Sequence, residues 1–221
     1  MPRLDPDQVG EFQRRLLRWY ARHGRDLPWR RTRDPYHILV SEVMLQQTQV
    51  ERVLGYYEPF LRRYPTIEAL AASPEPQVRE AWEGLGYYAR ARNLHRTARH
   101  VATQHSGKLP DDPEVIQRLP GIGRYTAGAV LSFAFQKDAA ILDTNAARVL
   151  RRVFGVRRSS SKARLQRRLW KIAEAVTPAG KADHFNQAIM DLGATVCQAR
   201  TPDCQRCPIR HHCRSEGKEG L

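Results

Sequence analysis

The 221-residue chain carries 37 lysines and arginines against 23 aspartates and glutamates, a formal net charge of +14. Hydrophobic residues make up 41% of it, which excludes a disordered composition and suits one large or two small domains. The chain has no signal-like N-terminus, and no apolar run approaches the roughly 18 residues of a membrane helix. We therefore expect an intracellular protein whose excess positive charge favours a polyanion such as nucleic acid.

Helical periodicity begins near the N-terminus and continues along the whole chain. Apolar side chains of residues 9–20 share one helical face. Neither the alternating pattern of β-strands nor an Asn-Gly hairpin turn occurs. The sequence therefore predicts an all-α fold, with later helices at 76–82, 89–105, 112–119, 124–135, 145–154, 162–176 and 185–197.

Two helices are predicted to meet near residue 46. Asp34-Pro35 suits the N-cap and the first position of a helix that ends near Leu45. Thr48-Gln49-Val50-Glu51 has the spacing of a capping box, so a second helix is expected to begin there. Gln46-Gln47 would then lie exposed at the joint between them.

Glu42 lies in the last turn of the first of these helices, within the apolar run from Ile38 to Leu45. Most helical glutamates face solvent, but no face of this segment is polar. Burial and the negative end of the helix dipole both raise the pKa of a carboxyl group. Such a group donates a proton near neutral pH, which makes Glu42 a candidate general acid.

Asp143 has the opposite setting, between the apolar run Ala139–Leu142 and the helix expected from Asn145. Backbone N–H groups and the positive dipole end favour an ionised aspartate there, although most aspartates at such positions are only helix caps. Together, Glu42 and Asp143 have the environments that distinguish a proton donor from an anionic stabiliser. Cleavage of a glycosidic bond needs that pair.

The segment Leu119–Gly128 is predicted to form a tight turn between two helices. Gly121 and Gly123 allow left-handed backbone and a close approach of the chain. The helix that opens at Arg124 presents unpaired N–H groups, which suit a phosphate. These features are typical of a helix-hairpin-helix, which binds the DNA backbone without reading its sequence. An ordinary corner between two helices fits the same residues.

All four cysteines lie near the end of the chain with the spacing Cys-x6-Cys-x2-Cys-x5-Cys. Such clustering in an intracellular chain argues against a disulfide framework. Zinc sites more often consist of two separated Cys-x2-Cys pairs, whereas a single tight group of four thiolates suits a [4Fe–4S] cluster. The predicted ligands are Cys197, Cys204, Cys207 and Cys213.

These segments together resemble the helix-hairpin-helix DNA glycosylases of the endonuclease III superfamily, and within it the adenine DNA glycosylases of the MutY type. The resemblance covers nearly all of the chain, from Leu27 to Cys213. It is carried by residues 41–50, 84–94, 119–128 and 185–193 and by the spacing of the cysteines.

The resemblance implies a six-helix barrel domain over residues 27–135, with its helix-hairpin-helix at 115–135. Residues 1–26 and 136–221 would form a second domain that carries the [4Fe–4S] cluster. The implied partner is double-stranded DNA with a mismatch or lesion, whose target base is flipped into a pocket. We expect a monomer in the cytoplasm, associated with the nucleoid and not with a membrane.

The resemblance also implies a role for each site residue. Glu42 matches the acid that protonates adenine, and Asp143 matches the carboxylate that stabilises the oxocarbenium ion, with Asn145 as its support. Tyr125 stands where bifunctional relatives carry a nucleophilic lysine; a phenol forms no Schiff base, so little or no strand cleavage is expected. The other implied positions are base-pocket residues Trp29, Arg30, Leu45 and Asp191 and DNA-binding residues Gln47, Tyr87, Gly121, Gly123 and Arg124.

Gln47 and Tyr87 match the residues that family members wedge into the duplex beside the opposite base. For at least one of Tyr87 and Tyr88, however, packing in the core is the expected role. The sequence ends eight residues after Cys213. We therefore expect it to lack the C-terminal domain with which MutY-type enzymes help to read 8-oxoguanine.

Three functions fit these residues. The leading hypothesis is a monofunctional glycosylase that removes adenine opposite guanine or 8-oxoguanine. The short chain and Tyr125 also resemble the thymine–guanine mismatch glycosylases, so removal of thymine or uracil opposite guanine is the alternative, although the stretch 46–49 favours the adenine branch. The third is a protein that binds lesions without excising them, against which the intact pair of Glu42 and Asp143 argues.

Overall fold

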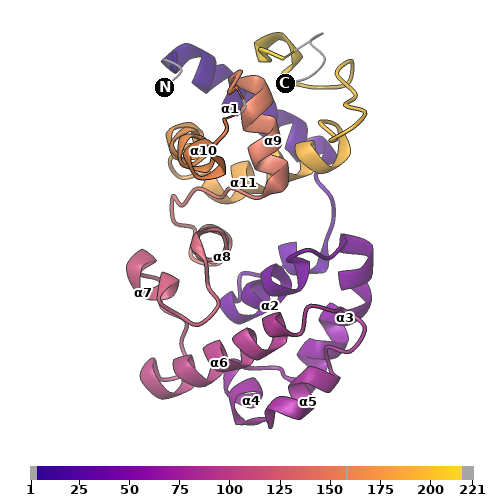
Figure 1. The fold of residues 1–221 in the computed structure, drawn as a ribbon, viewed down its shortest axis with the longest axis vertical. Helices are drawn as coiled ribbons and strands as arrows, with labels where there is room; N and C mark the ends of the chain where they lie inside the picture. Colours follow the sequence, from indigo (N-terminus) through magenta and orange to yellow (C-terminus); the bar gives the residue numbers. More distant parts are fainter. Residues whose placement is uncertain (1–3, 158, 216–221) are drawn as a thin grey trace. The chain divides into compact units, whose positions relative to one another are not determined.

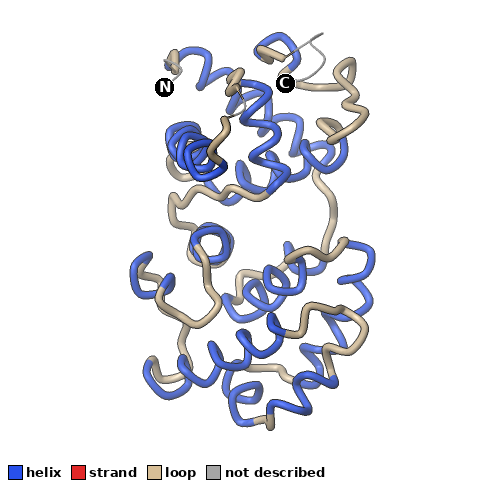
Figure 2. Tube along the Cα trace, in the orientation of Figure 1, coloured by secondary structure: helices blue, strands red, loops and turns tan. Residues whose placement is uncertain are grey.

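The computed structural model describes residues 4–157 and 159–215, and within those ranges every regular element is a helix (Figure 2). The all-α class predicted from the sequence is therefore confirmed. The chain forms two compact units, Leu27–Phe135 and Met1–Asp26 with Gln136–Leu221, which we name the central unit and the terminal unit. Their roles as barrel domain and iron–sulfur domain stay predictions.

The central unit is built around one helix that is apolar on every side. This helix, α2, packs against α3, α6 and α8 and against the short helix η1 (Figure 1). Every residue from Ile38 to Met44 is buried, because the helix has neighbours on several faces. The helices of this unit are η1 (Pro28–Arg30), α2 (Pro35–Leu45), α3 (Val50–Arg63), α4 (Ile67–Ala72), α5 (Glu75–Glu80), α6 (Ala89–Gln104), α7 (Pro113–Gln117) and α8 (Arg124–Phe133).

The terminal unit joins the first helix of the chain to the last ones. Its long helices pack as the pairs α1 with α11, α9 with α11 and α9 with α10. Phe12 lies at the centre of the core, edge-on to Phe154 at 5.6 Å and to Phe185 at 5.8 Å between ring centroids. The helices of this unit are α1 (Pro6–His23), α9 (Thr144–Val153), α10 (Lys162–Val176), α11 (Ala182–Thr195) and η2 (Arg210–His212).

Two details differ from the sequence predictions. Helix α4 was not predicted, although Thr66 caps it by accepting from the Ala69 backbone N–H at 3.2 Å. The predicted capping box at Thr48 is wrong: α3 begins at Val50 as expected, but its N-cap is Gln49, which makes no side-chain cap bond. The Thr48 hydroxyl instead accepts a hydrogen bond from Arg90.

No helix in residues 4–157 and 159–215 is both long enough and apolar enough to cross a bilayer.

Candidate active site

Glu42 projects from the last turn of α2 and is 3% exposed. The Tyr125 hydroxyl, near the start of α8, donates a hydrogen bond to Glu42 Oε2 at 2.7 Å. The two helices pack directly, so the phenol fixes the orientation of the buried carboxyl group. Tyr125 therefore stands beside the predicted acid and touches it, which the sequence alone did not indicate.

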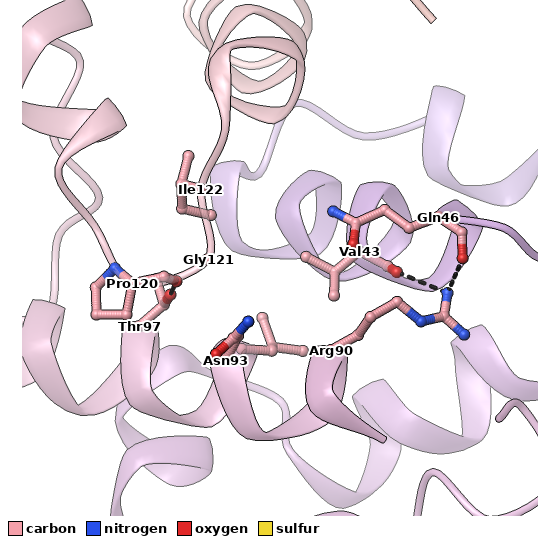
Figure 3. A pocket seen from close by; sticks show the side chains of 9 residues that line it. Val43, Gln46, Arg90, Asn93, Thr97, Pro120, Gly121 and Ile122 are labelled. Carbon is pink, nitrogen blue, oxygen red and sulfur yellow. Dashed lines mark hydrogen bonds between the residues drawn. The ribbon is translucent and has the colours of Figure 1, made fainter. Parts of the chain in front are cut away.

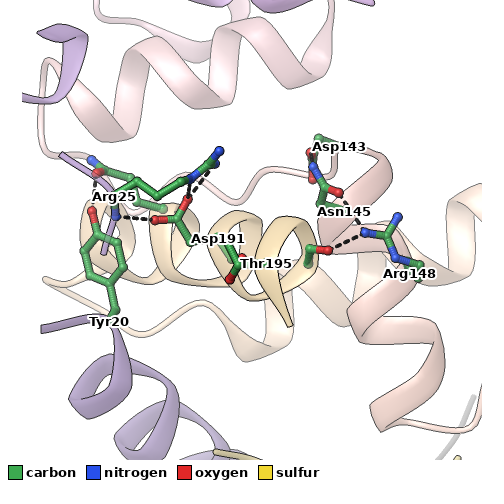
Figure 4. A network of polar contacts seen from close by, with 9 residues as sticks. Tyr20, Arg25, Asp143, Asn145, Arg148, Asp191 and Thr195 are labelled. Carbon is green, nitrogen blue, oxygen red and sulfur yellow. Dashed lines mark hydrogen bonds and ion pairs between the residues drawn. The ribbon is translucent and has the colours of Figure 1, made fainter. Parts of the chain in front are cut away.

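Asp143 is the N-cap of α9 and is half-buried in the terminal unit. Its Oδ1 accepts from the Ala146 backbone N–H at 2.6 Å, and its Oδ2 accepts from Asn145 Nδ2 at 2.9 Å. Arg148 Nη2 in turn donates to Asn145 Oδ1 at 2.8 Å and to the carbonyl of Gly193 at 2.6 Å (Figure 4). Each carboxyl oxygen of Asp143 thus has a hydrogen-bond donor, and one of these donors is Asn145. The role of Asn145 as the support of a catalytic carboxylate stays a prediction.

A close approach of two helices makes this arrangement possible. A Cβ atom on Gly193 would lie 2.6 Å from Asn145 Cβ and 3.0 Å from its backbone, so only glycine fits between α9 and α11 there. Arg148 was not singled out from the sequence, because an arginine on a basic helix carries no distinctive pattern. Its Nε also donates to the Cys197 carbonyl at 2.8 Å, and burial lowers the pKa of its guanidinium.

Asp191 is fully buried and is paired with Arg25 (Figure 4). The Arg25 backbone N–H donates to Asp191 Oδ2 at 2.9 Å, and its guanidinium donates to Oδ1 at 2.7 Å. The pair therefore ties the segment after α1 to α11 inside the terminal unit. A further role of Asp191 in a base pocket stays a prediction.

The other predicted base-pocket residues lie in the central unit. Trp29 is buried in η1 and meets the Tyr57 ring edge-on, with 5.5 Å between centroids. Arg30 ends η1 and Leu45 ends α2, and both are half-buried. Helix α2, which carries Glu42 and Leu45, packs against η1, which carries Trp29 and Arg30. A shared base pocket for these residues stays a prediction.

The predicted helix-hairpin-helix consists of α7, a turn and α8. Gly121 is the left-handed residue of the turn (φ +76°), and a Cβ there would lie 2.5 Å from Asn93 Cβ. Thr97 donates to the Pro120 carbonyl at 2.5 Å, so α6 supports the turn (Figure 3). Gly123 does not need left-handed backbone, contrary to the expectation from the sequence, because it is the extended N-cap of α8 (φ −87°).

The exposed side of this turn carries the predicted DNA-binding residues. Gly121, Gly123 and Arg124 are exposed, and Arg124 opens α8. Backbone N–H groups at the start of a helix can hold an anion, so the geometry suits a phosphate.

The two predicted wedge residues lie on exposed turns. Gln47 is exposed with φ +58°, and Tyr87 is 59% exposed with φ +49°. Tyr88 is also exposed, at 39%, so the expectation that one of the two tyrosines packs in the core is wrong. Gln46 is half-buried rather than exposed, and its amide donates to Thr126 Oγ1 at 3.4 Å.

The four cysteines follow α11 in the terminal unit, and none forms a disulfide. Cys197, Cys207 and Cys213 are half-buried and pack against the apolar core, whereas Cys204 is exposed. Arg152 Nη1 donates a hydrogen bond to Cys197 Sγ at 3.3 Å. Burial raises the pKa of the Cys207 thiol to about 12, so a metal would have to displace its proton.

The donor set fits a four-thiolate cluster in residue type, spacing and neighbouring positive charge. The side chains are not arranged as a formed site: across residues 4–157 and 159–215, no three His, Cys, Asp or Glu side chains group as metal ligands. The [4Fe–4S] cluster therefore remains a prediction based on the donors.

Comparison with known proteins identifies the family. The model of the HhH-GPD superfamily base excision DNA repair proteins matches residues 40–175. The chain belongs to this superfamily. The match spans α2 to α10 and so includes Glu42, the helix-hairpin-helix turn and Asp143, whereas the cysteines lie beyond it.

Relatives and solved structures of this superfamily agree with the fold. The chain is 42% identical over 220 residues to the adenine DNA glycosylase of Homo sapiens, covering 96% of this chain and 40% of that protein. The structure of a thermostable thymine-DNA glycosylase superposes with a TM-score of 0.84 at 33% identity, covering 94% of this chain and 96% of the other. A trapped endonuclease III–DNA covalent intermediate has a TM-score of 0.81 at 24% identity, covering 96% and 97%, which supports the fold alone.

The chain spans about half the length of the curated adenine DNA glycosylases that it matches, between 40% and 58% for three of them.

Proposed function

We propose that this protein is a base-excision-repair DNA glycosylase that hydrolyses the N-glycosidic bond of a mismatched adenine opposite guanine or 8-oxoguanine. The observation that carries the proposal is the buried carboxyl group of Glu42, oriented by Tyr125 at the end of an apolar helix. Identity of about 40% to adenine DNA glycosylases across most of the chain supports the choice of adenine. The partner is double-stranded DNA, which the net charge of +14 also favours.

The two carboxyl groups divide the reaction between them. Glu42 donates a proton to the flipped adenine as the bond between C1′ and N9 breaks, so that the electron pair of that bond leaves with a neutral base. Positive charge develops on the sugar, and the Asp143 carboxylate stabilises it. Water then adds to C1′ and gives up one proton, which returns the Glu42 carboxylate to its acid form, and an abasic site is left.

The remaining residues orient these groups and the DNA. Tyr125 holds the Glu42 carboxyl group, and Asn145 holds Asp143. Because Tyr125 lacks the amine needed for a Schiff base, the enzyme is monofunctional, with little or no lyase activity. The base pocket is lined by Trp29, Arg30 and Leu45. The duplex is entered by Gln47 and Tyr87. Phosphate is bound by the turn that contains Gly121, Gly123 and Arg124. We expect the enzyme to act as a monomer inside the cell.

Removal of thymine or uracil opposite guanine is the second candidate. It is favoured by the thermostable thymine-DNA glycosylase structure, which this chain matches over 96% of that protein's length. A panel of duplexes containing A·G, A·8-oxoguanine, T·G or U·G, treated with alkali after incubation, separates the candidates. Cleavage at A supports the proposal. Cleavage only at T or U supports the second candidate. If alkali cleaves none of the duplexes, the protein binds lesions without excising them.

The four cysteines are proposed to hold a [4Fe–4S] cluster. When bound, the cluster would supply covalent links that tie the loop 197–213 together, and no step of base release passes through it. Purified protein is expected to be brown, with absorbance near roughly 400 nm and about four irons per chain. Zinc in equal amount to protein, with no iron, would contradict the cluster.

A further inference from the structure

Arg90, the second residue of α6, is 8% exposed although it carries a charged side chain. Buried arginines are rare unless they are paired. Within the described ranges, no carboxylate pairs with Arg90. The four hydrogens on its Nη1 and Nη2 are instead shared among five backbone carbonyl groups and one hydroxyl group, all of them in the central unit. Burial lowers the pKa of this guanidinium.

One arm of the guanidinium contacts the end of α2. Nη1 donates to the carbonyl of Val43 at 3.0 Å and to that of Gln46 (Figure 3). It also donates to the carbonyl of Met44 at 2.7 Å. Val43 and Met44 directly follow Glu42 in the chain. The positive charge therefore lies at the negative end of the helix that carries the proposed acid.

The other arm contacts both exposed turns. Nη2 donates to Thr48 Oγ1 at 3.0 Å, and to the carbonyls of Leu85 at 3.3 Å and Gly86 at 3.1 Å. The guanidinium also lies 5.4 Å from the centre of the Tyr87 ring, within the range of a cation–π contact.

The bonds of Arg90 flank the two residues that are proposed to enter the duplex. Gln46 and Thr48 stand on either side of Gln47, and Gly86 precedes Tyr87. Gln47 and Tyr87 both have left-handed backbone, which costs energy for residues other than glycine and persists only where the surroundings hold it. An arginine that only capped α2 would bond to that helix alone. Arg90 instead bonds to the end of α2, to the turn around Gln47 and to the turn that precedes Tyr87.

We propose that Arg90 is a positioning residue that couples the two duplex-facing turns, which carry Gln47 and Tyr87, to the end of the helix that carries Glu42. This proposal rests on the proposed function and deepens it. Gln47 and Tyr87 would then enter the duplex in the same rigid movement that places the Glu42 carboxyl group against the flipped base. We therefore expect that lysine cannot replace Arg90, because one ammonium group cannot reach the partners of both Nη1 and Nη2.

The variant Arg90→Lys keeps the charge and removes the two-armed geometry. Arg99→Lys is the matched control, since Arg99 is exposed on the same helix and has no part in the proposed site. Each protein is mixed with the mismatch duplex from which the unaltered protein releases base, with 2-aminopurine beside the target. The fluorescence of 2-aminopurine rises when its neighbour leaves the stack. Single-turnover base release, DNA affinity and thermal unfolding are measured on the same samples.

We expect Arg90→Lys to lose most of the fluorescence rise and about tenfold or more of the single-turnover rate, as for loss of one charge-assisted hydrogen bond. DNA affinity should stay close to that of Arg99→Lys, which should behave as the unaltered protein. A fluorescence rise equal to the control would overturn the proposal, as would a rate that falls only in step with the folded fraction.

Thr48→Val provides a second test if Arg90→Lys does not fold. It removes one partner of Nη2 and keeps the side-chain volume, so a smaller loss of the fluorescence rise is expected; an unchanged rise would overturn the coupling. Failure of the proposed function can be distinguished from failure of this coupling. If the proposed function is wrong, the unaltered protein itself releases no base from any duplex of the panel.

Discussion

Glu42 and Asp143 are both carboxylates beside a helix end, yet their surroundings are opposite. Glu42 is buried near the C-terminal end of an apolar helix, and a phenol donates to it. Asp143 is half-buried at the N-terminal end of α9, where a backbone N–H and an amide donate to its two oxygens. An apolar segment therefore surrounds Glu42, whereas polar donors at a helix N-terminus hold Asp143. These surroundings support the different roles proposed for two similar side chains, proton donor for Glu42 and anionic stabiliser for Asp143.

The largest effect is expected for Glu42→Gln. The amide has nearly the same shape but no acidic proton, so single-turnover base release should fall by about 10²- to 10⁴-fold, the usual contribution of a general acid. DNA affinity, measured by fluorescence anisotropy, should change little. If Glu42→Gln still releases base at the normal rate, Glu42 is not the proton donor, and the proposed difference in role between Glu42 and Asp143 is wrong.

Asp143→Asn removes the proposed anionic stabiliser and keeps the capping geometry. Base release should fall by about 10²- to 10³-fold, the loss typical of one electrostatic stabiliser. Asparagine is also a good N-cap, so the unfolding temperature should stay close to that of the unaltered protein. If stability falls and base release does not, Asp143 is only a cap.

The smallest effect is expected for Tyr125→Phe, which removes the hydroxyl that orients Glu42. The acid remains, so single-turnover release should fall only about tenfold, as for the loss of one hydrogen bond. A loss as large as that of Glu42→Gln would show that the phenol itself takes part in proton transfer. No loss would show that packing alone orients the carboxyl group.

The sequence was most informative where a local pattern determines the structure. Asp34 caps α2, with its side chain accepting from the His37 backbone N–H at 3.0 Å, as predicted from the Asp34-Pro35 pair. The apolar residues on both sides of Glu42 correctly indicated that it lies in a buried segment. Both are properties of a few neighbouring residues, which is why they could be predicted.

The sequence was least informative where contacts join distant residues. Thr48 has the spacing of a capping box, but its hydroxyl bonds to Arg90, 42 positions later in the chain. Arg148 reaches Gly193 and Cys197 across two helices in the same way. At least one of Tyr87 and Tyr88 was expected to pack in the core, but the fold exposes both. Such contacts are decided by packing, which no local pattern records.

The central claim is that Glu42 donates the proton that releases adenine, and the direct measurement is the identity of the product. A duplex with one adenine opposite 8-oxoguanine is incubated with excess protein, and the base and strand are identified by mass spectrometry before any alkali is added. We expect the unaltered protein to give free adenine and an uncut strand with one abasic site, and Glu42→Gln to give neither. Absence of free adenine, or its release at equal rates by both proteins, would show that Glu42 is not the proton donor for adenine release.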